Sequence, residues 1–322
     1  MIPFATLRRA IETNLLNKNF HGTVPINTNY CKNNLGPYLA GLIEGDGHIY
    51  VPSTYRNLKG KKNVPSIEIC FDIKDLPLFE KIKEVLEGGY IAIRPNKKSG
   101  RLFLRKKVIL LKVINLINGH MRTPKIEALH RLIQWFNNEK GHYQIKFLGL
   151  DTSLLEHNSW LAGFIEADGN FYLNWKISDK SLNKDIISVI YYFRLSQRQE
   201  YSRKIDSSIK ESNIMIMSKI SEFLKTSVIS INRKRINYEE NAFLIKTDKI
   251  ESKNIIFAYL NKYPLFGYKY FAHVNLNLIH NLIIKSEHKT NIGKLRFLGY
   301  ANSMKYNSEI HNWEHLNKFY IH

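Results

Sequence analysis

Two stretches of this chain are nearly identical, and they decide how the rest is read. Residues 39–47 read LAGLIEGDG, and residues 161–169 read LAGFIEADG. Their separation is the length of a whole domain, far longer than the repeat of a solenoid. The 322-residue chain is therefore predicted to contain two fused copies of one domain.

Each stretch has the pattern of one short helix. In the first copy Pro37 suits the first helical turn, Leu39 and Ile43 recur at helical spacing, and Gly47 suits the residue after the helix. Small residues four positions apart give each helix a face on which two backbones can approach closely. These residues are Gly41 and Gly45 in the first copy, and Gly163 and Ala167 in the second. We expect the two helices to pack against each other as the domain interface.

That packing would bring together Asp46 and Asp168, the acids near the ends of the two helices. A carboxylate there opposes the helix dipole at a cost of roughly 0.3–1 kcal/mol, so we expect a compensating cation. Mg²⁺ suits the position because one or two carboxylates hold it while it keeps water and phosphate oxygens in its shell. At a phosphodiester bond such a site activates water and stabilises the leaving oxygen. Glu44 and Glu166 lie two residues earlier, roughly 200° around the helix, and are not expected to share the site.

The doubled motif resembles that of the LAGLIDADG homing endonucleases in their single-chain form, and the chain is similar to fungal mitochondrial intron-encoded members. The resemblance implies an α+β fold of two pseudo-symmetric αββαββα domains, packed through the motif helices, whose sheets form a DNA-binding saddle. We expect an N-terminal extension (1–34), a first domain (35–137), a linker (138–158), a second domain (159–310) and a C-terminal tail (311–322).

The resemblance also implies roles for individual residues. The last acid of each motif, Asp46 or Asp168, would bind the catalytic metal, helped by the backbone carbonyls of Gly45 and Ala167. This set predicts a metal-dependent DNA hydrolase with Mg²⁺ as its cofactor.

Basic and polar residues complete the site that the resemblance implies. Lys125 and Lys269 match a lysine near the scissile phosphate, where a positive charge stabilises the transition state, although either can also be an ordinary surface lysine. Gln197 matches a residue that orders water in the site. Its counterpart in the first half falls on the apolar Ile73, beside Asp72, so the two half-sites are expected to be unequal.

Charge and composition favour a nucleic-acid partner. The net charge is +20 and the pI is about 9.7, while 44% hydrophobic residues predict a folded core. Two cysteines provide neither a disulfide framework nor zinc-ligand spacing. Since no apolar run reaches the roughly 18 residues of a membrane span, no membrane partner is expected.

Residues 67–73, 101–105 and 171–176 alternate between apolar and polar, as strands with one buried face do. Their polar faces suit the major groove of DNA, and basic loops suit its phosphates, although a charged run is often only a solvated surface. The residues assigned to DNA contact are Arg56, Lys59, Lys61, Lys62, Arg94, Lys97, Lys98, Arg101, Arg105, Lys176, Lys180, Arg194, Arg198, Arg233, Lys234 and Arg235.

Helical patterns cover residues 76–87, 107–118, 125–137, 214–225 and 253–261. Residues 198–212 are polar and without periodicity, so we expect a loop there. Residues 1–34 are weakly similar to a transit peptide, with a polar extension of the first domain as the other interpretation.

Three functions are compatible with these features. The first is a monomeric endonuclease that cuts both strands of a long double-stranded DNA site using Mg²⁺. The second is an RNA-splicing maturase that binds its own intron RNA, alone or as a dual function, and the third is a non-cleaving DNA-binding regulator. Retention of Asp46 and Asp168 favours cleavage. The resemblance places the gene and protein in the mitochondrion, with the chloroplast as the alternative.

Overall fold

The computed structural model describes residues 34–54, 56–94, 98–139, 143–178, 185–202, 210–234, 238–305 and 312–320. The extension predicted at residues 1–34 lies outside these ranges except for Asn34, and so do Lys97, Lys180 and Arg235. None of the described helices combines the length and apolar character that a bilayer crossing requires.

The first half begins with the first motif helix and ends with two consecutive helices. Its elements are α3 (Leu35–Asp46), β1 (Gly47–Tyr50), β2 (Ser66–Asp72), η1 (Ile73–Asp75), α4 (Leu76–Val85), β3 (Tyr90–Ile93), β4 (Ser99–Leu104), α5 (Lys107–Ile117) and α6 (Ile126–Asn137). An extended segment that includes η2 (Leu155–His157) then leads to the second half.

The second half repeats this order and adds to it. Its elements are α7 (Trp160–Asp168), β5 (Gly169–Ile177), β6 (Ile186–Arg198), β7 (Glu200–Ser202), β8 (Lys210–Ser212), α8 (Ile214–Phe223), β9 (Val228–Lys234), β10 (Glu239–Lys246), α9 (Ile250–Lys262), α10 (Lys269–Ile284), η3 (Glu287–Lys289), α11 (Asn291–Lys305) and η4 (Glu314–Lys318). The α10 and α11 helices extend the predicted set of helices.

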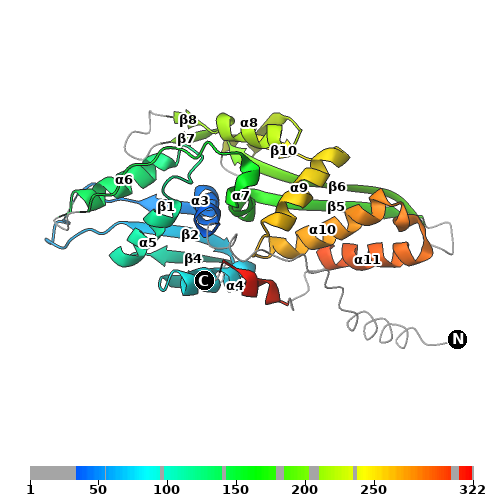
Figure 1. The fold of residues 1–322 in the computed structure, drawn as a ribbon, viewed down its shortest axis with the longest axis horizontal. Coiled ribbons are helices and arrows are strands. Elements are labelled where there is room, and N and C mark those ends of the chain that lie inside the picture. Colours follow the sequence, from blue (N-terminus) through cyan, green and yellow to red (C-terminus); the bar gives the residue numbers. More distant parts are fainter. Residues whose placement is uncertain are drawn as a thin grey trace.

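The two halves have equivalent antiparallel sheets, with strand orders β1-β2-β4-β3 and β5-β6-β10-β9. The register matches as well, because Gly47 pairs with Ile69 and Gly169 pairs with Leu195. In Figure 1 the α3 and α7 helices lie side by side at the centre, with one sheet on each side of them. The predicted α+β fold of two pseudo-symmetric halves packed through the motif helices is confirmed.

The predicted alternation within the strands is also confirmed. Ile67, Ile69 and Phe71 of β2 are buried against the helices, whereas Cys70 and Asp72 are exposed. Burying one face while the other stays in water is what a two-residue period predicts. Each sheet therefore has an outward face free of helices that carries polar and aromatic side chains.

The prediction of a loop at residues 198–212 is wrong for the residues of this stretch that the structure describes. The β6 strand runs to Arg198, and β7 pairs with β8 in an antiparallel hairpin in which Tyr201 lies opposite Glu211. The Tyr201 hydroxyl donates to Glu127 Oε1 of α6 at 2.6 Å, so the hairpin of the second half rests on a helix of the first. Three-residue polar strands carry too little periodicity to be recognised in sequence.

The C-terminal segment, residues 312–320, packs where the two halves meet. The ring of Phe319 lies 5.9 Å from Tyr38 of α3 and 4.9 Å from Phe266, which precedes α10. Phe319 is fully buried. The end of the chain thus adds an apolar contact between α3 and the second half.

Two histidines of α10 are buried in the core, and they differ in their hydrogen bonding. His280 is satisfied on both ring nitrogens, by the Tyr191 hydroxyl at 2.8 Å and by Asn254 Oδ1 at 2.6 Å. Neither ring nitrogen of the buried His273 has a hydrogen-bond partner among the described residues, and burial lowers the pKa of this imidazole to about 4. An unsatisfied buried polar group costs about 1–3 kcal/mol.

We expect His273→Leu to raise the free energy of unfolding by about 1–3 kcal/mol at pH 7.5, since it removes that unsatisfied group. Because the folded imidazole has the lower pKa, the unfolded chain takes up the proton first. The free energy of unfolding of the parent therefore falls as the pH drops from about 6.5, the usual histidine pKa, towards about 4. The gain from His273→Leu should accordingly be larger at pH 5 than at pH 7.5. Urea denaturation at pH 7.5 and pH 5 measures both effects.

His280→Leu is the matched control on the same helix. It should lower the free energy of unfolding, because it strands the hydroxyl of Tyr191 and the amide of Asn254. Equal effects of the two variants would contradict the interpretation of His273.

Candidate active site between the motif helices

The α3 and α7 helices touch at backbone distance. A Cβ atom on Gly41 would lie 2.1 Å from the carbonyl oxygen of Trp160, and one on Gly163 would lie 1.9 Å from that of Tyr38. A Cβ on Gly45 would lie 2.2 Å from that of Ala167. All of the small residues predicted at the interface therefore lie in the helix contact, three of them as glycines with no room for a side chain.

Glu44 and Glu166 hold the helix pair together through hydrogen bonds across it, and Glu44 also contributes to the wall of a pocket that contains Asp168. Glu44 accepts from the indole of Trp160 at 2.5 Å, across the interface, and Glu166 accepts from the hydroxyl of Tyr38 at 3.0 Å in the mirror contact. Glu44 also accepts from the backbone and side chain of Thr123. Burial raises the pKa of both glutamates to about 7. The prediction that they do not share the site of the aspartates agrees with this placement.

Asp46 and Asp168 are the last residues of α3 and α7 and lie beside each other. Asp46 is open to solvent on one side, but the protein atoms around it desolvate its carboxyl and raise its pKa to about 6. The negative charge of Asp168 also raises this pKa, whereas the positive charges of Lys269 and Lys125 lower it. Burial likewise raises the pKa of Asp168. Two adjacent carboxylates in such surroundings favour a bound cation, which would stabilise their ionised forms.

Lys125 and Lys269 lie at the ends of the motif helices in equivalent positions. Lys125 Nζ donates to the carbonyl oxygens of Glu44 at 2.5 Å and Gly47 at 2.9 Å. Lys269 Nζ donates to those of Glu166 and Ala167, both at 2.7 Å. Each lysine neutralises the negative end of a helix dipole, so these two side chains supply cationic compensation that the sequence alone assigned to metal.

Gln197 lies at the site, and its counterpart differs from the one predicted. Its Nε2 donates to Asp168 Oδ2 at 3.1 Å. Because Gly47 pairs with Ile69 as Gly169 pairs with Leu195, the residue equivalent to Gln197 is Phe71, two positions before the predicted Ile73. Phe71 is buried and its ring stacks on Phe79 at 4.1 Å. The surroundings of the two acids are therefore unequal because the counterpart of Gln197 is apolar, as expected, although it is Phe71 and not Ile73.

The groove beside Asp168 contains residues that the sequence did not assign to the site. A pocket of about 370 Å³ includes Lys125, Gln197 and Tyr201 in its wall, and one of about 510 Å³ includes Ala167. Asp168, Ser196 and Arg233 line both. Arg233 was predicted as a loop contact, but it lies on β9 at the active-site end of the sheet. Only the pairing of β9 with β10 and of β10 with β6 brings it there.

The other predicted DNA contacts divide into two groups. On the outward faces of the sheets lie Arg101, Lys176, Arg194 and Arg198, and in loops or at strand ends lie Arg56, Lys59, Lys61, Arg94, Lys98, Arg105 and Lys234. Several are ion-paired: Arg101 and Arg105 lie 3.6 and 3.7 Å from Glu68, and Arg198 contacts Glu240. Lys62 is held by the buried Glu139 above the ring of Trp135, so its charge is already compensated within the protein.

The oxygen ligands at the helix ends suit a hard divalent cation. Within the described ranges no group of three or more histidine, cysteine, aspartate or glutamate side chains can hold a metal. Asp46, Asp168 and the carbonyl of Gly45, with water and phosphate oxygens, form the donor set that Mg²⁺ or Ca²⁺ prefers. The carbonyl of Ala167 already accepts from Lys269, which leaves it one lone pair for a metal.

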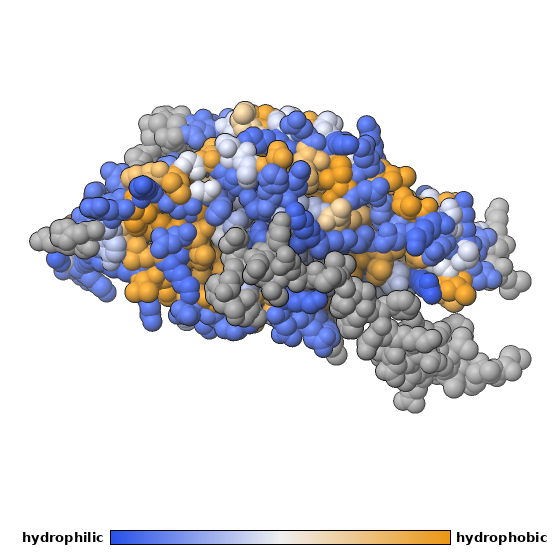
Figure 2. Space-filling view, viewed as in Figure 1, coloured by the Kyte–Doolittle hydropathy of each residue, from blue (hydrophilic) through white to orange (hydrophobic). Residues whose placement is uncertain are grey.

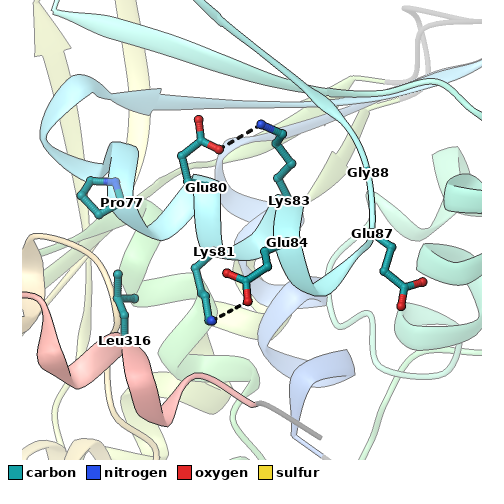
Figure 3. Close-up of a pocket in the computed structure, with 8 residues that line it drawn as sticks. All are labelled: Pro77, Glu80, Lys81, Lys83, Glu84, Glu87, Gly88 and Leu316. Carbon is teal, nitrogen blue, oxygen red and sulfur yellow. Dashed lines mark hydrogen bonds and ion pairs between the residues drawn. The ribbon is translucent and has the colours of Figure 1, made fainter.

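A pocket away from the motif acids does not offer comparable chemistry. It lies along α4 and is closed at one end by Leu316 of the C-terminal segment (Figure 3). Glu80 and Glu84 in its wall are paired with Lys83 and Lys81 at 3.0 and 2.8 Å. Glu87, beyond the end of α4, pairs with Lys112 of α5 at 3.0 Å, so the acidic charges of this pocket are neutralised by neighbouring lysines. On the face in Figure 2 hydrophilic side chains cover most of the centre, and apolar ones gather over each half.

Paired acids at the ends of two packed helices, between two equivalent sheets, define the two-motif nuclease class, and comparison with known proteins agrees. The sequence profile of the LAGLIDADG endonuclease family matches residues 39–136 and 161–280. This chain belongs to that family, and the predicted resemblance is confirmed.

Two yeast relatives are similar over different lengths. The intron-encoded DNA endonuclease aI3 of Saccharomyces cerevisiae is 30% identical over 319 residues, which cover 91% of this chain and 74% of that protein. The intron-encoded RNA maturase bI4 of the same yeast is 32% identical over 163 residues, 48% of this chain and 23% of the maturase.

The fold has solved counterparts. The structure of I-SmaMI bound to uncleaved DNA target in the presence of calcium ions aligns with a TM-score of 0.53 over 84% of this chain and 98% of that one. Sequence identity there is 16%, so the likeness concerns the fold.

Proposed function

We propose that this protein is a homing endonuclease that hydrolyses one phosphodiester bond in each strand of a long double-stranded DNA site, as a monomer and with Mg²⁺. The observation that carries the proposal is the contact of α3 with α7, which sets Asp46 and Asp168 side by side between two equivalent sheets. A pseudo-two-fold site of this kind is matched to the two strands of a duplex. Residues 35–137 and 159–310 would each serve one half of the target.

The chain's own residues would position the phosphate and the water. Asp46, Asp168 and the carbonyl of Gly45 would hold Mg²⁺, which supplies Lewis-acid activation of water and of the phosphate. Gln197 donates to Asp168 and so fixes the orientation of that carboxylate. Lys125 and Lys269 keep positive charge next to the acids without occupying their outer faces.

The outward faces of the sheets would hold the duplex. They carry basic side chains beside stacked aromatic pairs, such as Tyr172 and Tyr192 at 4.7 Å and Tyr90 and Phe103 at 6.3 Å. Major-groove edges present a distinct pattern for each base pair, so a sheet with varied polar residues can read sequence there. Basic residues at the sheet ends would contact phosphates, which fix register.

If about ten phosphates are neutralised, the logarithm of DNA affinity should fall against the logarithm of salt concentration with a slope near −9. Fluorescence anisotropy with a labelled duplex, in Ca²⁺ to suppress cutting, measures the slope. A slope near zero would contradict the electrostatic role of the loops. As a control, Lys62→Ala should leave the slope unchanged, since Lys62 is occupied by Glu139.

A cleavage screen tests the proposed activity. The full-length protein is incubated with a library of DNA duplexes and Mg²⁺, and with the same library in EDTA, and the ends produced are sequenced. Double-strand breaks at one sequence, dependent on the metal and absent in an Asp46→Asn/Asp168→Asn double variant, are the expected result. Breaks that persist in the double variant would overturn the assignment.

A second function rests on the maturase relative. Similarity to an intron-encoded RNA maturase over 48% of this chain favours a role in folding its own intron RNA, alone or beside cleavage. Specific duplex binding without cutting, from well-folded protein, would favour this role or that of a regulator, and binding to the intron transcript would separate the two.

We also propose a mitochondrial location. Its support is the intron-encoded character of the two yeast relatives and the abundance of Asn, Lys and Ile, which AT-rich coding sequence produces. The chloroplast alternative gains no support, because yeasts contain no chloroplasts. Import assays with isolated mitochondria, or localisation of the gene, test the location.

A further inference from the structure

The two motif acids are differently equipped. Asp168 accepts a hydrogen bond from Gln197 at 3.1 Å, and Arg233 lines both pockets that Asp168 lines. Asp46 accepts no hydrogen bond from any described residue. Besides the two lysines, its strongest electrostatic neighbours are the acids Asp168 and Asp75. Among the residues that the structure describes, the Asp168 side of the pair is thus richer in donors than the Asp46 side.

Arg233 is held in place by groups other than Asp168. One terminal nitrogen donates to Glu240 Oε2 at 3.2 Å and the other to the hydroxyl of Ser196. Its side chain is 25% exposed, and it lines both pockets that contain Asp168. A guanidinium has five N–H donors, so these contacts leave donors directed at neither partner.

Glu240 fixes the direction of this guanidinium. It binds Arg198 and Arg233 together and is itself nine-tenths buried. Arg233 makes no ion pair with Asp168 in the described part of the chain, which keeps the outer oxygens of the acid free. A planar guanidinium fixed beside a carboxylate, with donors unused, is suited to a phosphate group.

We propose that Arg233 is a catalytic residue that contacts the scissile phosphate on the Asp168 side, and that the strand on this side is cut before the other. This inference rests on the proposed endonuclease function. In the step concerned, water adds to phosphorus, one P–O ester bond breaks, and a proton passes to the leaving oxygen. Arg233 stabilises the negative charge that grows on the phosphate oxygens during that step.

The expected rate difference follows from the size of such an interaction. Removing one preorganised donor to a developing anion slows an enzyme by about 10²–10³-fold. A strand that has such a donor should therefore be cut well before a strand that lacks it. A duplex that is cut in one strand only should therefore accumulate before the linear product forms.

Strand-resolved kinetics test the proposal. The full-length protein is mixed in excess with a supercoiled plasmid carrying the duplex selected in the cleavage screen, which separates nicked from linear product. In a parallel reaction a linear duplex of the same sequence, with a different label on the 5′ end of each strand, gives the rate for each strand. The variants are Arg233→Ala and Arg233→Lys. The matched control is Lys225→Ala, because Lys225 is an exposed basic residue just before β9 that pairs with Glu251 and lines neither pocket. Duplex affinity in Ca²⁺ and the urea unfolding midpoint are measured for each.

The parent should accumulate nicked circles, and Arg233→Ala should slow the faster strand by about 10²-fold while affinity changes less than tenfold. Arg233→Lys should restore part of the rate, since it keeps the charge but loses the fork. Lys225→Ala should leave both rates within about threefold of the parent, since Lys225 pairs with Glu251 away from the site.

Three results would overturn the proposal: simultaneous cutting of both strands by the parent, equal slowing of both strands by Arg233→Ala, or a rate loss no larger than the affinity loss. If the parent cuts neither strand, the endonuclease function fails as well. If the parent cuts both strands but one of these three results is found, only the Arg233 assignment fails. An unchanged unfolding midpoint separates a local effect from misfolding.

Discussion

Asp168→Asn and Asp46→Asn should each reduce double-strand cleavage by about 10³-fold or more, the upper range for loss of one electrostatic partner in an active site. Asparagine keeps the shape of the side chain but removes the charge that a divalent cation requires. Because the surroundings raise the pKa of both carboxyls, each ionised acid is unfavourable to the fold at neutral pH. The variants should therefore unfold at the same or higher urea concentration than the parent.

This pairing of lost activity with retained stability makes the test specific. Single-turnover cleavage of the selected duplex gives the rate, and anisotropy in Ca²⁺ gives the affinity, which should change less than the rate. Asp248→Asn is the control, because Asp248 is an exposed acid that pairs with Lys246 at 2.8 Å outside the site. Full cleavage by either motif variant, or equal loss in the control, would remove the assignment of the motif acids.

Gly163→Ala should cause a large loss of stability, because it adds a methyl group where the two motif helices touch. Its Cβ would lie 1.9 Å from the carbonyl oxygen of Tyr38 and 3.0 Å from the amide nitrogen of Leu42. Both atoms belong to the backbone of α3, so relief requires the helices to separate. Overpacking usually costs about 1–3 kcal/mol, and we expect a value at or above that range.

The same separation would disturb the site, because the helices end in the motif acids. Activity at a temperature where Gly163→Ala is still folded should thus fall along with stability. Gly299→Ala is the matched control: Gly299 lies within α11, no atom lies within 4 Å of the place that its methyl group would take, and alanine there should stabilise by about 0.5–1 kcal/mol. Urea unfolding compares the two, and a Gly163→Ala variant as stable as the parent would contradict the close approach.

The local features of the fold were largely predictable from sequence. Helix and strand periods in residues 67–73 and 107–118 depend on side chains close in the chain, and the structure contains both elements within two residues of the prediction. The repeat predicted the pseudo-symmetry, and the four-residue spacing of Gly41 and Gly45 predicted a close helix contact. Short polar strands such as β7 escaped notice because burial gives them no pattern.

The site was predictable only in part. Asp46 and Asp168 were found because both belong to a motif that repeats. The equivalence of Gln197 with Phe71 depends on strand register, and an error of two residues in an alignment leaves the inward and outward pattern intact. No local pattern reveals such a shift.

By itself, the sequence determined that this protein has two similar halves, each with an acid at the end of a helix. The small residues of that helix predict close packing against a second helix. Only the tertiary structure decided that Lys125 and Lys269 cap those helices, that Tyr201 rests on α6, and that Arg233 stands beside Asp168. The physical reason is how far apart along the chain the contacting residues lie. Periodicity records contacts within a few residues, whereas these contacts join residues tens to more than a hundred positions apart, brought together by strand pairing and by the packing of α3 on α7.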